Sequence, residues 1–191
     1  MDEVRGVIVF KQKTRGLWER GSNIPLCSSM DGKTGTTAEG ETRNCATCPY
    51  NQWGSGTNEA GQPTKGKACK EMRRVFIAQP GAYVPVFISL PPTSLKAFDT
   101  YCSARLSRGI ADTAAETIFR LIPEKSDAGF SYAVIQCKMG RKLQPQEMLQ
   151  YIRMRDRVVA AAAKIGITEE DYMQDDEVES EARPADDDQP F

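Results

Sequence analysis

Five short segments of the chain are runs of apolar residues rich in β-branched and aromatic side chains, and such runs predict β-strands. The five segments are 4–13, 73–79, 83–90, 116–122 and 130–139. Pro85 lies inside the third segment, where it indicates an edge strand or a bulge because proline has no backbone N–H to donate. The two dipeptides Pro80-Gly81 and Pro91-Pro92 bound that segment as a turn and a stop.

Two other stretches place apolar residues three and four positions apart, which predicts helices. The first begins at Thr93 or Ser94, either of which can cap it, and ends near Arg108, before Gly109. The second runs from about Pro145 to Ile165. The residues expected to be buried are Leu95, Phe98, Tyr101 or Cys102 and Leu106 in the first helix, and Met148, Leu149, Ile152, Val158, Val159 and Ile165 in the second.

Residues 14–72 interrupt this regular pattern. They are rich in Gly, Thr, Ser and Asn, contain few Leu, Ile or Val, and carry four of the six cysteines. A stretch of this composition cannot form a conventional apolar core. We therefore expect it to be disordered, or to be held together by something other than apolar packing.

Five strands with a helix between the third and the fourth is the chain order of the OB-fold, a partly open β-barrel that commonly binds oligonucleotides. We therefore expect a mainly β, OB-fold-like barrel over residues 1–167, with an insertion at about 14–72, two helices, and a disordered tail over 168–191. An α+β sheet with the same element order is the alternative.

The cysteines of the insertion are spaced C-x17-C-x2-C-x20-C, at Cys27, Cys45, Cys48 and Cys69. A CxxC pair presents two thiolates to one ion, and Zn²⁺ prefers four tetrahedral ligands, so we expect one structural zinc ion. The zinc would supply the folding energy that the insertion lacks. Iron–sulfur ligation remains chemically possible. Two disulfides are disfavoured by the absence of an export signal, which also indicates a cytoplasmic protein, and the context of a thioredoxin-like motif is missing.

The composition and charge of the chain exclude several kinds of catalysis and indicate what the protein attracts. The chain has no histidine, which excludes Ser-His-Asp and Cys-His catalysis and any metal site that contains histidine. The net charge of −1 hides a segregation: residues 168–191 hold eleven acids and one base, for −10, and residues 1–167 carry +9. A basic body attracts polyanions, whereas an acidic tail repels them. We expect no enzymatic activity, because four thiolates would close the zinc coordination and the acids of the body are scattered.

The last six residues, Asp186-Asp187-Asp188-Gln189-Pro190-Phe191, combine acids with a terminal aromatic residue and a free carboxylate. This ending resembles the acidic tip of bacterial-type single-stranded DNA-binding proteins, with Gln189 where an apolar residue is more usual. An OB-like body interrupted early by a cysteine module is similar to phage-encoded single-stranded DNA-binding proteins, including the zinc-containing T-even phage type, although the present cluster lacks that type's histidine ligand. The resemblance implies a tip that binds partner proteins through Asp186, Asp187, Asp188, Pro190 and Phe191.

The resemblance also implies a cationic groove with aromatic platforms for bases. Trp53, in a glycine-rich loop, is either such a platform or a lid on the zinc module, and strand aromatics such as Phe76 and Phe87 are more often part of a core. The candidate DNA-binding residues are Tyr50, Trp53, Lys65, Lys67, Arg73, Arg74, Tyr83, Phe87, Tyr132, Lys138, Arg141 and Lys142.

We therefore expect a sequence-independent single-stranded DNA-binding protein of phage replication or recombination. Its body would coat the strand, and its tail would recruit replication or recombination proteins. We expect no contact with a membrane, and both a monomer and a homo-oligomer are compatible with this function. The alternative is a zinc-ribbon adaptor, or a regulator of transcription or recombination, that binds protein or duplex DNA.

Overall fold

The computed structural model describes residues 3–19, 22, 24–58, 61–125, 131–162 and 164. The acidic tail, including the predicted partner-binding tip Asp186–Asp188, Pro190 and Phe191, lies outside this range. The described elements are β1 (Glu3–Leu17), β2 (Cys27–Ser29), β3 (Thr34–Thr37), β4 (Thr42–Asn44), the 3₁₀ turn η1 (Pro49–Asn51), β5 (Lys70–Ala78), β6 (Val86–Leu90), α1 (Pro92–Leu106), the 3₁₀ turn η2 (Asp112–Ala114), β7 (Ala115–Lys125), β8 (Ser131–Lys142) and α2 (Pro145–Ala162).

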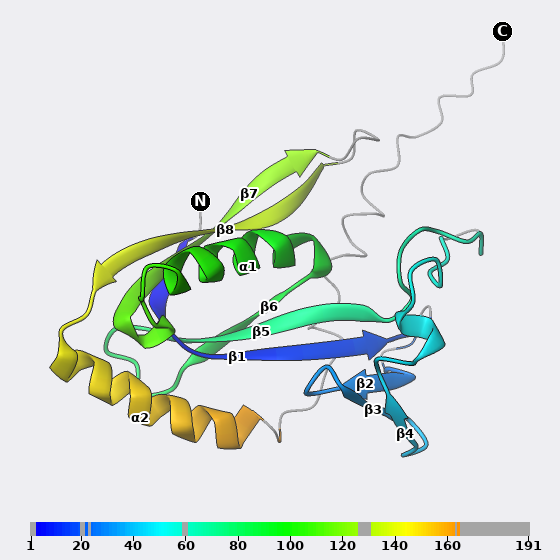
Figure 1. Cartoon of the computed structure of the whole chain (residues 1–191), viewed down its shortest axis with the longest axis horizontal. Helices are drawn as coiled ribbons and strands as arrows, with labels where there is room; N and C mark the ends of the chain where they lie inside the picture. Colours follow the sequence, from blue (N-terminus) through cyan, green and yellow to red (C-terminus); the bar gives the residue numbers. More distant parts are fainter. Residues whose placement is uncertain are drawn as a thin grey trace, which may run out of the picture.

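The eight described strands form one antiparallel sheet that is organised around the long strand β1 (Figure 1). β5 pairs with β1 from Val7 to Gly16, and β6 continues the sheet beyond β5. At its start β1 also pairs with β7, and at its end it pairs with β2, so that β2, β3 and β4 extend the sheet on the side away from β5. All five predicted strands are present, and β1 is longer than expected.

The chain is mainly β as expected, but the sheet does not close into the expected OB-fold-like barrel: no pairing joins β6 to β8 within the described residues. β6 has only five residues and ends at Leu90, where Pro91 and Pro92 turn the chain into α1. The first turn of α1 then contacts β8, where the backbone N–H of Ile135 donates to Ser94 Oγ at 3.1 Å. A helix therefore lies against β8 where a closed barrel would need a strand pair.

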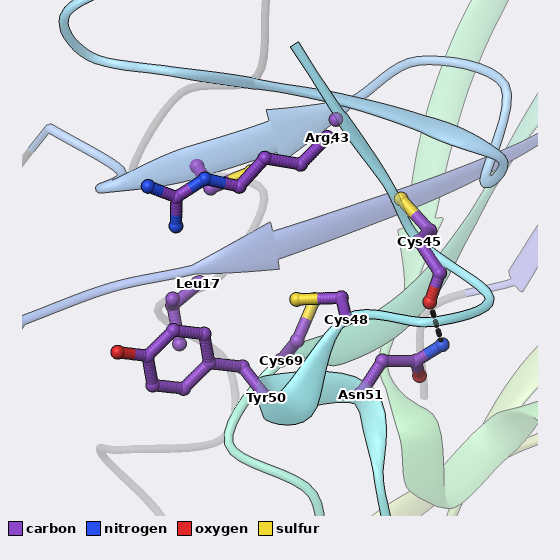
Figure 2. A pocket seen from close by; sticks show the side chains of 9 residues that line it. Leu17, Arg43, Cys45, Cys48, Tyr50, Asn51 and Cys69 are labelled. Atoms are coloured by element: carbon purple, nitrogen blue, oxygen red, sulfur yellow. Dashed lines mark hydrogen bonds between the residues drawn. The ribbon is translucent and has the colours of Figure 1, made fainter. Parts of the chain in front are cut away.

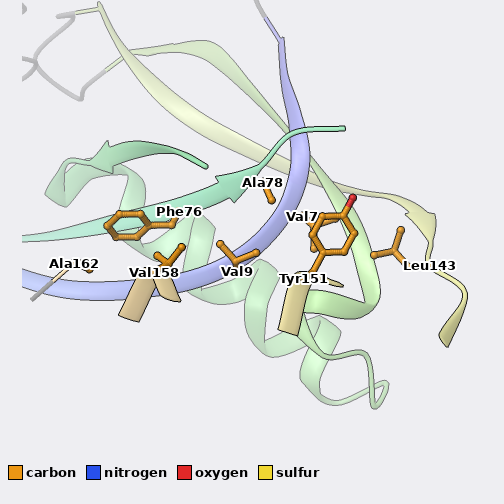
Figure 3. Packing of buried hydrophobic residues seen from close by; sticks show 8 residues of the cluster. All are labelled: Val7, Val9, Phe76, Ala78, Leu143, Tyr151, Val158 and Ala162. Carbon is orange, nitrogen blue, oxygen red and sulfur yellow. The ribbon is translucent and has the colours of Figure 1, made fainter. Parts of the chain in front are cut away.

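Two apolar cores lie on opposite faces of the sheet. On one face, α1 contributes Phe98 to a core with Ile8, Val75, Ile77, Leu90, Phe119 and Ile135. On the other face, which we call the outer face, α2 packs on β1 and β5 (Figure 3). That second core contains Val7, Val9, Phe76, Ala78, Leu143, Tyr151, Val158 and Ala162.

The helices bury partly different residues from those expected. Leu106 lies at the last position of α1 and is 76% exposed, whereas its neighbour Arg105 is buried. Arg105 donates to Thr117 Oγ1 at 2.9 Å and to the backbone oxygen of Ala111 at 2.7 Å, which fastens the end of α1 to β7.

α2 buries the stripe Tyr151, Val158 and Ala162, which leaves Leu149 and Val159 about half exposed. The buried positions are seven and then four residues apart, which is one continuous stripe on a helix. Among the described residues, no helix is both long and apolar enough to cross a bilayer.

A candidate metal centre and nucleic-acid interface

The four cysteines of the insertion converge on one small pocket (Figure 2). Cys27 begins β2, Cys45 follows β4, Cys48 precedes η1, and Cys69 precedes β5. All four are free thiols, and Leu17, Gly35, Arg43, Tyr50 and Asn51 complete the lining. Residues that are up to 42 positions apart in the sequence thus present sulfur to one place, which is the arrangement that the spacing predicts.

Local sequence features of the insertion bring the thiols together. Asp31 Oδ1 accepts the backbone N–H groups of Lys33 at 2.7 Å and Thr34 at 2.8 Å, which forms the turn between β2 and β3. On β3, Gly35 passes so close to the thiols that a Cβ there would lie 2.8 Å from Cys27 Sγ and 3.6 Å from Cys45 Sγ. A larger residue at position 35 would push the Cys27 sulfur atom aside, whereas the contact with Cys45 Sγ would be an ordinary van der Waals contact.

Arg15 of β1 fastens the insertion to the body of the sheet. Its guanidinium donates to Asn51 Oδ1 at 2.7 Å and to the backbone oxygen of Gly32 at 3.2 Å, and it forms an ion pair with Glu71 of β5. Asn51 in turn donates to the backbone oxygen of Cys45 at 2.6 Å. Side-chain hydrogen bonds therefore connect the sheet directly to the cysteine pocket, in a region with few apolar residues.

Burial and the neighbouring thiols raise the pKa of two of the cysteines, Cys27 and Cys69. The pKa of Cys69 is raised to about 11, mainly by burial, with Arg15 acting to lower it and the other three thiols acting to raise it. Burial and the neighbouring thiols also raise the pKa of Cys27, and Arg43 acts in the opposite direction. Metal binding would replace protons on these groups, and the two arginines offset part of the negative charge that results.

The thiols are close together but not in a coordination polyhedron. Within the part of the chain that the structure describes, no group of three or more His, Cys, Asp or Glu side chains is arranged to hold a metal ion. The donor set nevertheless fits zinc, since four cysteines line one pocket and no histidine or carboxylate lines it with them.

On the outer face, β1, β5 and β6 carry an aromatic and cationic cluster that we call the outer-face patch: Phe10, Arg74, Phe76 and Phe87. Phe76 lies directly opposite Phe87 in the strand register, with ring centroids 5.5 Å apart, and Phe10 lies 5.7 Å from Phe76. The guanidinium carbon of Arg74 lies 5.3 Å from the centroid of the Phe87 ring.

Exposure differs sharply within the outer-face patch. Phe76 is 4% exposed and belongs to the core, as strand aromatics usually do, and Arg74 is 1% exposed. Phe87, in contrast, is 41% exposed. Phe87 is therefore the aromatic ring of β5 and β6 in this patch that keeps part of its surface accessible to a ligand.

The insertion carries a second aromatic group. Trp53 is 78% exposed and is not among the residues that line the cysteine pocket, so it is not a lid on the thiols. Lys67 Nζ lies 5.1 Å from the centroid of its ring and donates to Asn51 Oδ1 at 3.3 Å. Tyr50 lines the pocket and is 43% exposed, and Lys65 is exposed.

The remaining candidate DNA-binding residues belong neither to the outer-face patch nor to the group around Trp53. Tyr83 is 97% exposed, in the turn that joins β5 to β6. β5 starts at the insertion and has nine residues, so its two ends are about 30 Å apart and Tyr83 lies far from Trp53.

On β8, Lys138 and Lys142 are exposed, and Tyr132 donates to Glu124. Two candidate cations are held by carboxylates: Arg73 by Asp99 at 3.0 Å and Glu71 at 3.7 Å, and Arg141 by Glu147 at 2.9 Å and Glu116 at 3.5 Å.

Sequence reasoning missed Phe10, Arg15 and Asn51. The alternation of β1 places Phe10 on the same face as Gln12, and this could have identified it as a neighbour of the strand aromatics. Arg15 and Asn51 carry no such signal, because their partners are distant in the sequence. No model of a known protein family matches this chain, and no curated protein matches its sequence.

Proposed function

We propose that this protein binds single-stranded DNA without sequence preference, and that the outer-face patch is the centre of its binding surface. The observation that carries the proposal is Phe87, a half-exposed ring beside the guanidinium of the buried Arg74. Aromatic faces stack on any base, and each stack contributes about 1–3 kcal/mol.

The order of the strands supports an OB-like ancestry for this surface. β6, β5, β1, β7 and β8 are neighbours in that order, which corresponds to the third, second, first, fourth and fifth strands of an OB-fold in which the last pairing is absent. OB-folds bind oligonucleotides on the face of strands two and three, flanked by the loops after strands one and four. In this chain those strands are β5 and β6, and the two loops are the cysteine insertion and the β7–β8 connection.

We further propose that Cys27, Cys45, Cys48 and Cys69 bind one structural Zn²⁺ ion. The insertion has little apolar core, so a metal bound by four thiolates would supply stability that packing does not. Four protein ligands leave no coordination position for a reacting water, which agrees with a binding protein rather than an enzyme.

The charge distribution supports the same function. A body of +9 attracts a polyanion, and a tail of −10 that ends in Pro190-Phe191 is suited to a pocket with basic residues on a replication or recombination protein. The tip resembles that of bacterial-type single-stranded DNA-binding proteins, and the early cysteine module in an OB-like body is similar to that of phage-encoded ones. Both resemblances support a role in replication or recombination.

Competition between oligonucleotides tests the proposal. A fluorescently labelled dT oligonucleotide is bound to the intact protein and then displaced with unlabelled single-stranded or duplex DNA of equal length. We expect the single strand to displace it at a concentration at least tenfold lower. Preferential displacement by the duplex would favour the alternative of a zinc-ribbon regulator and would contradict the proposal.

A further inference from the structure

A second cavity lies on the insertion beside the cysteine pocket, and it has a different chemical character. Its volume is about 720 Å³, and its nine lining residues include three cations and no carboxylate. We call it the insertion groove. Its principal donor side chains are Arg15, Lys33, Thr34, Thr42, Arg43 and Asn44.

The floor of the insertion groove is fixed by the contacts that hold the insertion to the sheet. Arg15 and Asn51 both line the groove, and they are joined by a hydrogen bond of 2.7 Å. Arg15 is 8% exposed and Asn51 is 9% exposed, so neither can move without disrupting the packing around it. The groove is thus preorganised, which reduces the cost of binding a ligand.

The exposed cations of the groove are available to a ligand. Lys33 forms no ion pair with any residue in the described ranges, and Asp31, the nearest acid in the sequence, is occupied by backbone N–H groups. Arg43 pairs with Glu41 at 3.2 Å, and both side chains are about half exposed or more, so the pair is weak. Arg43 also lines the cysteine pocket (Figure 2), which places it between the two cavities.

Asn51 links the groove to the exposed aromatic residue of the insertion. Lys67 donates to Asn51 Oδ1 at 3.3 Å, and the same Nζ lies 5.1 Å from the centroid of the Trp53 ring. A strand whose phosphate lies in the groove would therefore have a neighbouring base within reach of Trp53. The volume is too large for a phosphate ion alone and suits a nucleotide segment.

We propose that the insertion groove binds the phosphodiester backbone of single-stranded DNA, with an adjacent base stacked on Trp53. This inference rests on the proposed function and extends it, since it places a second part of the DNA path on the insertion. It assigns roles to Lys33 and Arg43, which no sequence motif marks as DNA-binding residues.

Lys33→Ala tests the inference, because the Lys33 side chain makes no contact that the fold needs. The matched control is Lys96→Ala, which removes an equally exposed lysine from α1. Affinity for poly-dT is measured from about 0.05 to 0.3 M salt, and one lost phosphate contact reduces the salt slope by about 0.7. At 0.1 M salt this corresponds to binding about fivefold weaker for Lys33→Ala, with Lys96→Ala unchanged.

A second variant, Trp53→Ala, tests the proposed stacking of a base on Trp53. We expect it to weaken binding by about fivefold or more, and we expect the double variant with Lys33→Ala to be no better than either single variant. Equal affinities of Lys33→Ala, Lys96→Ala and the intact protein would overturn the groove and leave the outer-face function standing. An intact protein that does not bind poly-dT would overturn both.

Discussion

Replacing Phe87 is the sharpest structural test of the outer-face patch. The ring is 41% exposed and packs on Phe76, so Phe87→Ala removes about half of the contacts that a buried phenylalanine makes. A fully buried Phe→Ala change costs about 3–5 kcal/mol, and we therefore expect a stability loss of about 2 kcal/mol. The protein should remain folded.

Phe87→Ala should weaken DNA binding by more than its effect on the stability of the fold can explain. Loss of one base stack costs about 1–3 kcal/mol, which corresponds to a Kd about 5- to 150-fold higher. Phe87→Leu keeps an apolar side chain but removes the aromatic face, so it should bind as weakly as Phe87→Ala. Phe87→Tyr keeps the face and should bind within about threefold of the intact protein.

Val86 provides the matched control for this series. It is adjacent to Phe87 on β6 and 42% exposed, but it pairs with Ile77, which lies in the core beneath α1 and thus on the opposite face. Val86→Ala should leave the affinity for a dT oligonucleotide unchanged, as measured by fluorescence titration. If Phe87→Leu binds as tightly as the intact protein, or if Val86→Ala weakens binding equally, base stacking on this face is refuted.

Four further outcomes follow from the structure and the charge distribution. Cys45→Ser should lower the zinc content of the purified protein well below one ion per chain by elemental analysis, and full occupancy would refute the ligand set. Arg105→Met should cost about 3 kcal/mol in urea unfolding because it leaves buried acceptors without a donor, whereas the exposed Arg108→Met should cost less than about 0.5 kcal/mol, and equal costs would contradict the role of Arg105. Hydrogen bonds from Arg141 lower the pKa of Glu147, so the stabilising effect of the ionised carboxylate is present at neutral pH and is lost as the pH falls through the lowered pKa. Glu147→Gln should therefore lower the melting temperature at about pH 7 but not at about pH 3. A difference that does not depend on pH would contradict this. Removal of residues 168–191 should tighten single-stranded DNA binding, because a tethered polyanion no longer competes with it, and an unchanged Kd would refute that competition.

The positions of the regular elements were predictable because their signals are local. Runs of β-branched and aromatic residues identified all five strands of the body. The proline pair marked the start of α1, although the helix begins at Pro92 and is not capped by the side chain of Thr93 or Ser94 as expected. The open sheet was not predictable in the same way, because it depends on a contact between Ser94 and the backbone of Ile135, which are 41 residues apart. Pro85, which indicated an edge strand or a bulge in the segment 83–90, was a sequence hint to this, and β6 has only five residues in the structure.

The cysteine pocket was predictable because metal-ligand spacing is itself a sequence signal. The groove beside it was not, since Arg15 and Asn51 are ordinary residues until the fold joins them. The same limit applies to Arg73 and Arg141, which were candidates for phosphate contacts but are paired with carboxylates on other elements. Sequence alone shows which charges a chain has, and the structure shows which of them are already paired.

The salt dependence of binding by the intact protein tests the central claim most directly. Poly-dT, poly-dA and duplex DNA are titrated with the protein over about 0.05 to 0.3 M salt. We expect poly-dT and poly-dA to bind with affinities within about tenfold of each other, both at least tenfold more tightly than the duplex, and with affinity that falls steeply as salt rises. Affinity that does not change with salt, or a preference for the duplex, would contradict a single-stranded DNA-binding surface on this fold.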